Sequence, residues 1–258
     1  PLQASYVVKP LRNDNPLNGV STKDITVIQR HILGKELITD PYILLAADVN
    51  NSRSVTASDI AEMRRLILGI IPEFRVVKSW TFVPSAYKFA DPSNPFDAPR
   101  EQNVNFGVTK ETKDVPFVAV KMGDVTQDAR ASNLNAGKTR TNGSLLFEID
   151  EKNLSGGGTY KVDFKSSDFV NIIGYQFTLK FDASALSFEG IEAGVLNTNE
   201  SNFGLNRLNQ GIITTSWDAQ EGTSFGKNEV LFSIILRANK NVKMSQVLAI
   251  NSEVTNAE

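Results

Sequence analysis

The sequence predicts a two-domain α+β protein, with a small all-α domain of loop–helix repeats followed by an all-β sandwich or jelly roll. Three observations support this prediction. A loop-and-helix pattern occurs twice in the first third of the chain. From Ser144 onward, apolar and polar residues alternate with the period of two that strands require. Between the two regions, residues 129–142 are small, polar and aperiodic, as is typical of a linker.

Composition narrows the function classes. The 258 residues carry a net charge of −2, which gives no electrostatic reason to expect nucleic acid or an anionic membrane as partner. No apolar run is long enough to span a bilayer. The absence of cysteine excludes disulfides, thiol catalysis and zinc–thiolate sites. For a small domain without disulfides, a bound metal is the obvious remaining way to stabilise the fold.

The N-terminal elements have clear sequence signals. Residues 1–10 form an extended segment, either a strand that pairs with a neighbouring domain or copy, or a tail that packs locally. The first helix starts at Ser21 or Thr22, has Asp24 in its first turn, and ends at Gly34. Its expected apolar stripe consists of Ile25, Ile28 and Ile32.

Two further helices complete the first domain. Asp40-Pro41 starts a short one, because Asp caps helices well and Pro suits the first helical position. The next runs from about Ser58 to Leu68 and stops before Pro72. Its solvent-exposed face is expected to carry Glu62, Arg64 and Arg65.

A candidate metal loop lies between these two helices, over Asp48–Asp59. Oxygen-bearing side chains occupy its first, third, fifth and twelfth positions, and a carbonyl is available at the seventh, which is the spacing of an EF-hand-type calcium loop. The sixth position, normally glycine, is Arg53. The alternative is an Asx-rich turn that caps a helix without metal. The candidate Ca²⁺ ligands are Asp48, Asn50, Ser52, Ser54 and Asp59.

A degraded copy of this loop is predicted upstream. Residues 20–25 align with residues 55–60, and Ile32-Leu33-Gly34 aligns with Ile67-Leu68-Gly69. Leu17 replaces the fifth ligand of the upstream copy, so we expect this loop to hold calcium weakly or not at all. Its candidate ligands are Asn13, Asn15, Gly19 and Asp24.

Residues 73–128 have no strong periodicity. Four alternating aromatic residues, Trp80 to Phe89, are expected to pack on the helices rather than form an open platform for sugars. The run from Gly123 to Asp128 is similar to the start of a calcium loop. Its twelfth position would be Asn135 and no apolar helix follows, so we interpret this run as a turn.

Five strands are predicted in the second domain. Turns between them are predicted at Gly156-Gly157-Gly158 and at Gly211. Short strands at regular spacing favour a sandwich or jelly roll. The predicted strands are Leu145–Ile149, Tyr160–Phe164, Gly174–Phe181, Ile212–Trp217 and Val230–Leu236.

The duplicated loop–helix unit resembles the dockerin domain, whose paired calcium loops precede apolar helices that end in Leu-Gly. The resemblance covers about Asn13 to Ile70. The second domain resembles a cohesin domain through segments such as LFEID, GTYKVDFK and NIIGYQFTLKFDASALSFEGIEAG. Cohesins are non-catalytic jelly rolls that bind dockerins through one sheet face. The implied organisation is a strand at 1–10, a dockerin-like domain at 11–72, an extension packing on it at 73–128, a linker at 129–142 and a cohesin-like sandwich at 143–258.

The resemblance implies a secreted or bacterial cell-surface assembly module whose partner is a cohesin- or dockerin-type protein, or another copy of this chain. By position in the dockerin repeat, the partner-binding residues are Thr22, Lys23, Gln29, Arg30, Ala57, Ser58, Arg64 and Arg65. Two alternatives stay open. One is an adhesin or carbohydrate-binding fragment that uses Trp80, Trp217 or Tyr175, and the other is an accessory region of a secreted polysaccharide hydrolase.

An enzyme is not expected. The chain has a single histidine, His31, and no pattern of a serine-hydrolase elbow, a zinc protease or a phosphate loop. Acidic residues are plentiful in the second domain, but the sequence pairs no two of them as a glycosidase would require.

Overall fold

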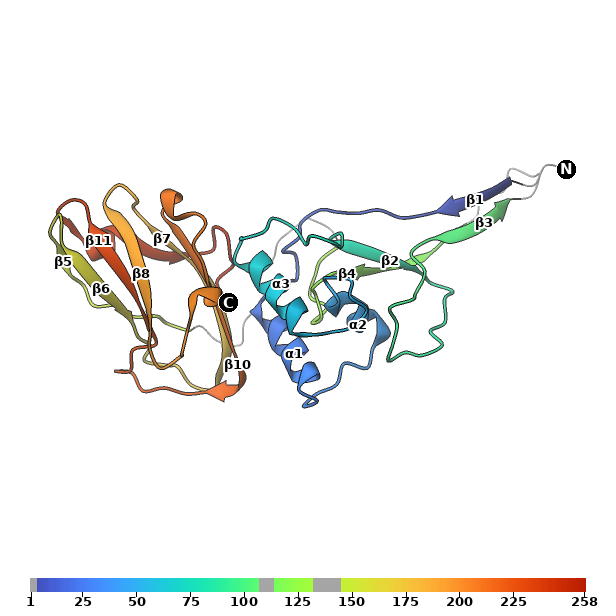
Figure 1. The fold of residues 1–258 in the computed structure, drawn as a ribbon, viewed down its shortest axis with the longest axis horizontal. Coiled ribbons are helices and arrows are strands. Elements are labelled where there is room, and N and C mark those ends of the chain that lie inside the picture. Colours follow the sequence, from blue (N-terminus) through green and yellow to red (C-terminus); the bar gives the residue numbers. More distant parts are fainter. Residues whose placement is uncertain (1–3, 107–113, 132–144) are drawn as a thin grey trace. The chain divides into compact units, whose positions relative to one another are not determined.

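The computed structural model describes residues 4–106, 114–131 and 145–258. The described chain divides into two compact units (Figure 1). The first, called the helical unit, comprises the residues up to Leu66 and Pro72–Ala131. The second, called the sandwich unit, comprises Ile67–Ile71 and the residues from Leu145 onward. None of the described helices is long and apolar enough to cross a membrane.

The helical unit contains α1 (Thr22–Ile32), α2 (Pro41–Ala47) and α3 (Ala57–Ile67). Ser21 caps α1 in a capping box with Asp24, which satisfies backbone donors at the helix start. Asp40 Oδ1 accepts from the backbone N–H groups of the first turn of α2. The caps are therefore those that the sequence predicts.

Two antiparallel strand pairs belong to the same unit. β2 (Trp80–Pro84) pairs with β4 (Phe117–Lys121), and β1 (Ala4–Val8) pairs with β3 (Gln102–Phe106). The extended N-terminal segment thus finds its partner strand within its own unit. The buried core combines residues of all three helices with β2 and β4, namely Ile25, Ile28, Leu45, Met63, Val83 and Val120. Ile32, predicted to share the apolar stripe of α1, is instead 39% exposed because it is the last residue of the helix.

Glu62 also differs from its predicted place on an exposed face. It is buried, and its carboxylate accepts from Arg75 Nε at 3.0 Å and from Arg75 Nη2 at 2.6 Å. The hydrogen bond from Arg75 is the main cause that lowers the pKa of Glu62, and burial opposes it. The ion pair ties the segment after α3 back onto that helix.

The Glu62→Gln variant is expected to lose about 1 kcal/mol or less at neutral pH, because the Arg75 side chain is mostly exposed and the pair is screened. A lowered pKa in the folded state stabilises the protein above the unfolded-state pKa, and this contribution disappears as pH falls through the folded-state pKa. Urea unfolding should therefore show a smaller difference between wild type and Glu62→Gln at pH 3 than at pH 7. An equal difference at both pH values would contradict this.

The sandwich unit contains two facing sheets and short flanking elements (Figure 1). One sheet has the order β13-β7-β10-β9, and the other has the order β6-β11-β8, while β12 pairs with β5. The strands are β5 (Asn153–Leu154), β6 (Thr159–Phe164), β7 (Ile172–Phe181), β8 (Leu186–Ala193), β9 (Phe203–Gly204), β10 (Ile212–Thr223), β11 (Phe232–Ala238), β12 (Val242–Lys243) and β13 (Leu248–Asn251). The short helical elements are η1 (Glu200–Asn202), η2 (Leu208–Gln210) and α4 (Met244–Val247).

The alternation of apolar and polar residues along β7 places its apolar side chains in the core between the two sheets. Its buried apolar side chains, from Tyr175 to Phe181, join residues of the facing sheet in one continuous cluster. Gln176 and Thr178 on the opposite side are buried too, because the C-terminal segment lies along β7: Thr178 Oγ1 donates to Thr255 O and accepts from Thr255 N. β7 is thus covered on both faces.

The predicted strand Leu145–Ile149 is wrong as a strand. It forms only an isolated bridge between Glu148 and Lys165. Its apolar residues Leu145, Phe147 and Ile149 nevertheless pack against the core. The alternation therefore predicted the buried side correctly, although a regular ladder does not form there.

Candidate metal site

The loop between α2 and α3 contains the candidate site. Asp48 follows the last residue of α2, and Asp59 lies in the first turn of α3. Both carboxylates are buried, whereas Ser52 and Ser54 are exposed and Asn50 is half-buried. The two helices therefore fix the acidic ends of the loop while its middle faces solvent.

Asp48 organises the first half of the loop. Its Oδ1 accepts from Ser52 N at 2.8 Å and its Oδ2 from Arg53 N at 2.9 Å. Ser52 Oγ lies 3.5 Å from Asp48 Oδ1 and 3.1 Å from Ser54 O. Oxygen atoms of the first, fifth and seventh positions therefore lie close together, as ligands of one cation must.

Asp59 closes the loop. Its Oδ1 accepts from Asn50 N at 3.3 Å, and its Oδ2 accepts from Thr56 N at 2.9 Å. Burial is the main cause that raises the pKa of Asp59; the backbone hydrogen bonds lower it, and the charge of Asp48 raises it further. The charge of Asp48 therefore adds to the cost of ionising the buried Asp59, and a bound cation would relieve that cost.

The turn in this loop needs left-handed backbone at two positions. Arg53 has φ +67° at the sixth position, where glycine is usual, and Asn51 has φ +55°. Asn tolerates this region better than Arg does. The Arg53 side chain forms an ion pair with Asp97 outside the loop. The missing glycine therefore does not prevent the turn.

The donor set fits a hard cation. Every candidate ligand is an oxygen, as calcium prefers. Among the described residues, no group of three or more His, Cys, Asp or Glu side chains is arranged to hold a metal ion. Amide, hydroxyl and carbonyl oxygens would therefore complete the coordination beside the two carboxylates. His31 does not contribute, since its Nδ1 accepts from Ile38 N at 3.0 Å.

The structure does not bring the four residues predicted for the upstream loop together. Asn13 Oδ1 accepts from Ser79 N at 2.9 Å, and Asn13 Nδ2 donates to Glu73 at 2.7 Å. Asn15 is exposed. The Asn13 side chain is therefore held by the segment after α3, not by the start of α1.

Asp24 is fully buried, and its contacts come from an unexpected segment. Its Oδ1 accepts from Val125 N at 2.9 Å and from Thr126 N at 3.0 Å. Burial raises the pKa of Asp24 to about 7. The run from Gly123 to Asp128, interpreted from the sequence as an isolated turn, thus lies against α1. The sequence feature that could have indicated this contact is the similarity of Gly123–Asp128 to the start of a calcium loop. Asn135, the twelfth position of a contiguous loop starting there, lies outside the described residues.

The predicted partner-binding residues fall into three groups by exposure. Thr22 is buried, which contradicts a contact role for its side chain in this conformation. Gln29 and Arg64 are half-buried. The exposed members, located on α1 and α3, are Lys23, Arg30, Ala57, Ser58 and Arg65.

The aromatic platform considered for glycan binding is not exposed. Trp80 is 9% exposed and has the Arg12 guanidinium 4.8 Å from its ring centroid. Trp217 is 7% exposed, and its Nε1 donates to Leu196 O at 3.2 Å. Tyr175 is buried between neighbouring rings. These three side chains are core residues. For Trp80 this agrees with the expectation of packing, and it counts against the alternative in which the three form an exposed platform for sugars.

Two family models match the chain: the dockerin type I domain at residues 18–68 and the cohesin domain at residues 157–258. Both domain types are non-catalytic modules. No curated protein matches this chain.

Several solved structures of cohesins align with part of the chain. One is the third cohesin of ScaC in complex with the ScaB dockerin from Acetivibrio cellulolyticus, with 15% identity, 43% of this chain and 90% of that chain covered, and a TM-score of 0.29. Another is the type II cohesin A11 from Bacteroides cellulosolvens, with 17% identity, 43% and 78% coverage, and a TM-score of 0.33. A third is the seventh ScaB type I cohesin from Pseudobacteroides cellulosolvens, with 24% identity, 38% and 76% coverage, and a TM-score of 0.28.

Proposed function

Because the chain carries a dockerin type I domain followed by a cohesin domain, we propose that it is a non-catalytic protein–protein assembly module that works outside the cell, at the bacterial surface. The helical unit would dock onto a cohesin-type sheet, and the sandwich unit would receive a dockerin-type helical surface. The observation that carries this proposal is the presence of both complementary module types on one chain.

Calcium would hold the docking surface in shape. The Asp48–Asp59 loop supports this, because its buried carboxylates and converging oxygens suit Ca²⁺. The loop also joins α2 to α3 directly. An ion bound there would fix the start of α3, which carries part of the exposed surface.

The docking surface would consist of the exposed residues of α1 and α3. Lys23 and Arg30 on α1 and Arg65 on α3 give it a positive character, while Ala57 and Ser58 are small and allow close approach. The partner would be another copy of this chain or a different cohesin-bearing protein. A contact between two different faces of identical chains is heterologous, so it produces rings or open filaments.

Sedimentation velocity of the full chain across a dilution series tests self-assembly. With calcium, we expect larger species at higher concentration, and with chelator we expect a monomer throughout. The double variant Lys23→Glu/Arg65→Glu should weaken assembly at least tenfold, because it reverses two charges on the docking surface. The matched control is Lys88→Glu, an exposed charge reversal away from α1 and α3.

Different results separate the two kinds of partner. A monomer at all concentrations, with and without calcium, would remove self-assembly and leave a different cohesin-bearing protein as the partner. Equal weakening by the double variant and by Lys88→Glu would contradict the proposed surface.

A further inference from the structure

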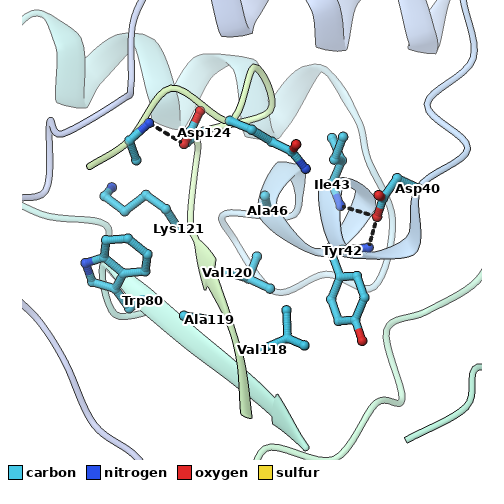
Figure 2. Close-up of a pocket in the computed structure, with 12 residues that line it drawn as sticks. Asp40, Tyr42, Ile43, Ala46, Trp80, Val118, Ala119, Val120, Lys121 and Asp124 are labelled. Carbon is cyan, nitrogen blue, oxygen red and sulfur yellow. Dashed lines mark hydrogen bonds between the residues drawn. The ribbon is translucent and has the colours of Figure 1, made fainter. Parts of the chain in front are cut away.

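Two buried carboxylates from distant parts of the helical unit meet at one turn of the chain. Thr126 links them, since its Oγ1 lies 2.9 Å from Asp24 Oδ1 and 3.5 Å from Asp124 Oδ1. Thr126 and Asp24 are 102 residues apart in sequence. Figure 2 shows Asp124 accepting a hydrogen bond at the edge of a pocket that Lys121 and Trp80 also line.

The hydrogen bonds of Asp124 repeat those of Asp48. In the Asp48–Asp59 loop, the first carboxylate accepts from the backbone of the fifth and sixth positions. Asp124 likewise accepts from Asp128 N at 3.1 Å and from Ala129 N at 2.9 Å. The fourth position is left-handed in both cases, with φ +55° for Asn51 and +59° for Gln127.

The hydrogen bonds of Asp24 repeat those of Asp59. Asp59 accepts from the backbone of the third position at Oδ1 and of the ninth position at Oδ2. Asp24 accepts from Thr126 N at Oδ1, at 3.0 Å, and from Ser21 N at Oδ2, at 2.9 Å. Residues 124–129 can be counted as positions one to six and residues 19–24 as positions seven to twelve. With this numbering, the backbone donors in both loops are the third, fifth, sixth and ninth positions.

The seam between the two halves is a close backbone contact, independent of the carboxylates. A Cβ added to Gly19 would lie 2.6 Å from Ala129 N, so the sixth and seventh positions abut without a peptide bond. Asn18 holds the seam: its Oδ1 accepts from Arg130 N at 3.2 Å and its Nδ2 donates to Arg130 O at 2.8 Å.

The sequence and the family match agree with this division. Gly123-Asp124-Val125 is equivalent to Ala47-Asp48-Val49 at the start of the contiguous loop. The dockerin type I match begins at residue 18, directly before the seventh position of the first loop. The match therefore includes positions seven to twelve of this loop and leaves out Asn13 and Asn15.

We propose that residues 124–129 and 19–24 form a second twelve-position calcium loop, split in sequence and joined only by non-covalent contacts. The candidate ligands are Asp124, Thr126, Asp24 and the Gly19 carbonyl. The Asp128 carboxylate would join them on binding, since the described residues contain no group of three acidic side chains already arranged to hold a metal. This inference rests on the calcium role proposed above, and it assigns that role to residues that no contiguous pattern contains. The order of the two half-loops along the chain is permuted relative to the Asp48–Asp59 loop.

The split has a mechanical consequence. In a contiguous loop, the ion stabilises a turn that the chain already closes. Here the ion would hold residues 124–129, the last of which is the first residue of the predicted linker, against the start of α1. Calcium would therefore also fix where the linker leaves the helical unit.

Calcium titration by calorimetry of the chelator-treated full chain tests the proposal. We expect two ions per chain, and in Asp128→Ala we expect one of the two sites to weaken at least tenfold. Asp128 is chosen because only its backbone N–H takes part in the bonds to Asp124 described above, so its side chain can be removed without breaking them. One ion in wild type, unchanged in Asp128→Ala, would overturn the split loop and leave the contiguous loop intact. No ion at all would overturn the proposed calcium role itself.

A pair of glycine variants tests the seam. Gly19→Ala places a methyl group against the Ala129 backbone, and we expect it to reduce the stoichiometry to one ion. Gly34→Ala is the matched control, since Gly34 has φ +68°, close to the +70° of Gly19, and no atom lies near its added Cβ. It should retain two ions, with helical circular dichroism confirming that both variants fold. Equal stoichiometry in the two variants would overturn the proposed seam.

Discussion

The Phe232→Ala variant is expected to lower the free energy of unfolding of the sandwich unit by about 3–5 kcal/mol, the usual cost of removing a buried aromatic ring. Phe232 is fully buried on β11. Its ring stacks on Phe164 with centroids 4.6 Å apart and packs edge-on against Phe203 at 5.6 Å. Phe164 and Phe203 belong to opposite sheets, so the ring couples both halves of the sandwich.

This loss should be visible in chemical denaturation followed by the fluorescence of Trp217, in a Trp80→Phe background that leaves no other tryptophan. The control is Val170→Ala, because Val170 is 67% exposed and its truncation should change stability by less than about 0.5 kcal/mol. A loss for Phe232→Ala as small as that of the control would mean that the two sheets do not depend on this ring.

The contiguous loop could be recognised in the sequence because all its candidate ligands lie within twelve residues. Its repetition upstream also made Asp24 a candidate loop end, since the helix after it is contiguous with it, and a calcium-binding role for Asp24 stays a prediction. Asn13 and Asn15 were chosen because a linear search places loop positions one and three directly upstream. In sequence, the three helices and strands β2, β3 and β4 lie between the two halves, so no local pattern joins Asp24 to Asp124.

Periodicity predicted which apolar side chains are buried. It did not predict where regular strand pairing forms, or which polar side chains are buried. Phe147 packs in the core as expected, although it forms no regular strand. Glu62 was assigned to solvent because charged residues usually lie there, but Arg75 is distant in sequence and pairs with it only after folding. Thr22 was assigned to a partner by its place in the repeat, which says nothing about the packing that buries it.

Removal of calcium is expected to destabilise the helical unit and leave the sandwich unit unchanged. Each site adds about 2.7 kcal/mol when free calcium is 100 times its dissociation constant, so two sites would add about twice that. The effect should be large because Asp48, Asp59, Asp24 and Asp124 are all buried. Without an ion, each pair brings two carboxyl groups together away from water, where ionising both of them is costly.

The two tryptophans allow both units to be followed in one chain. Trp217→Phe leaves Trp80 as the reporter of the helical unit, and Trp80→Phe leaves Trp217 as the reporter of the sandwich unit. With chelator, the unfolding midpoint reported by Trp80 should fall to lower denaturant, while the midpoint reported by Trp217 serves as the internal control. Asp128→Ala should lose about half of the calcium-dependent stabilisation, because it weakens the split loop alone. Identical Trp80 midpoints with and without chelator would contradict a structural role for calcium, since an ion that binds only the folded unit must stabilise it.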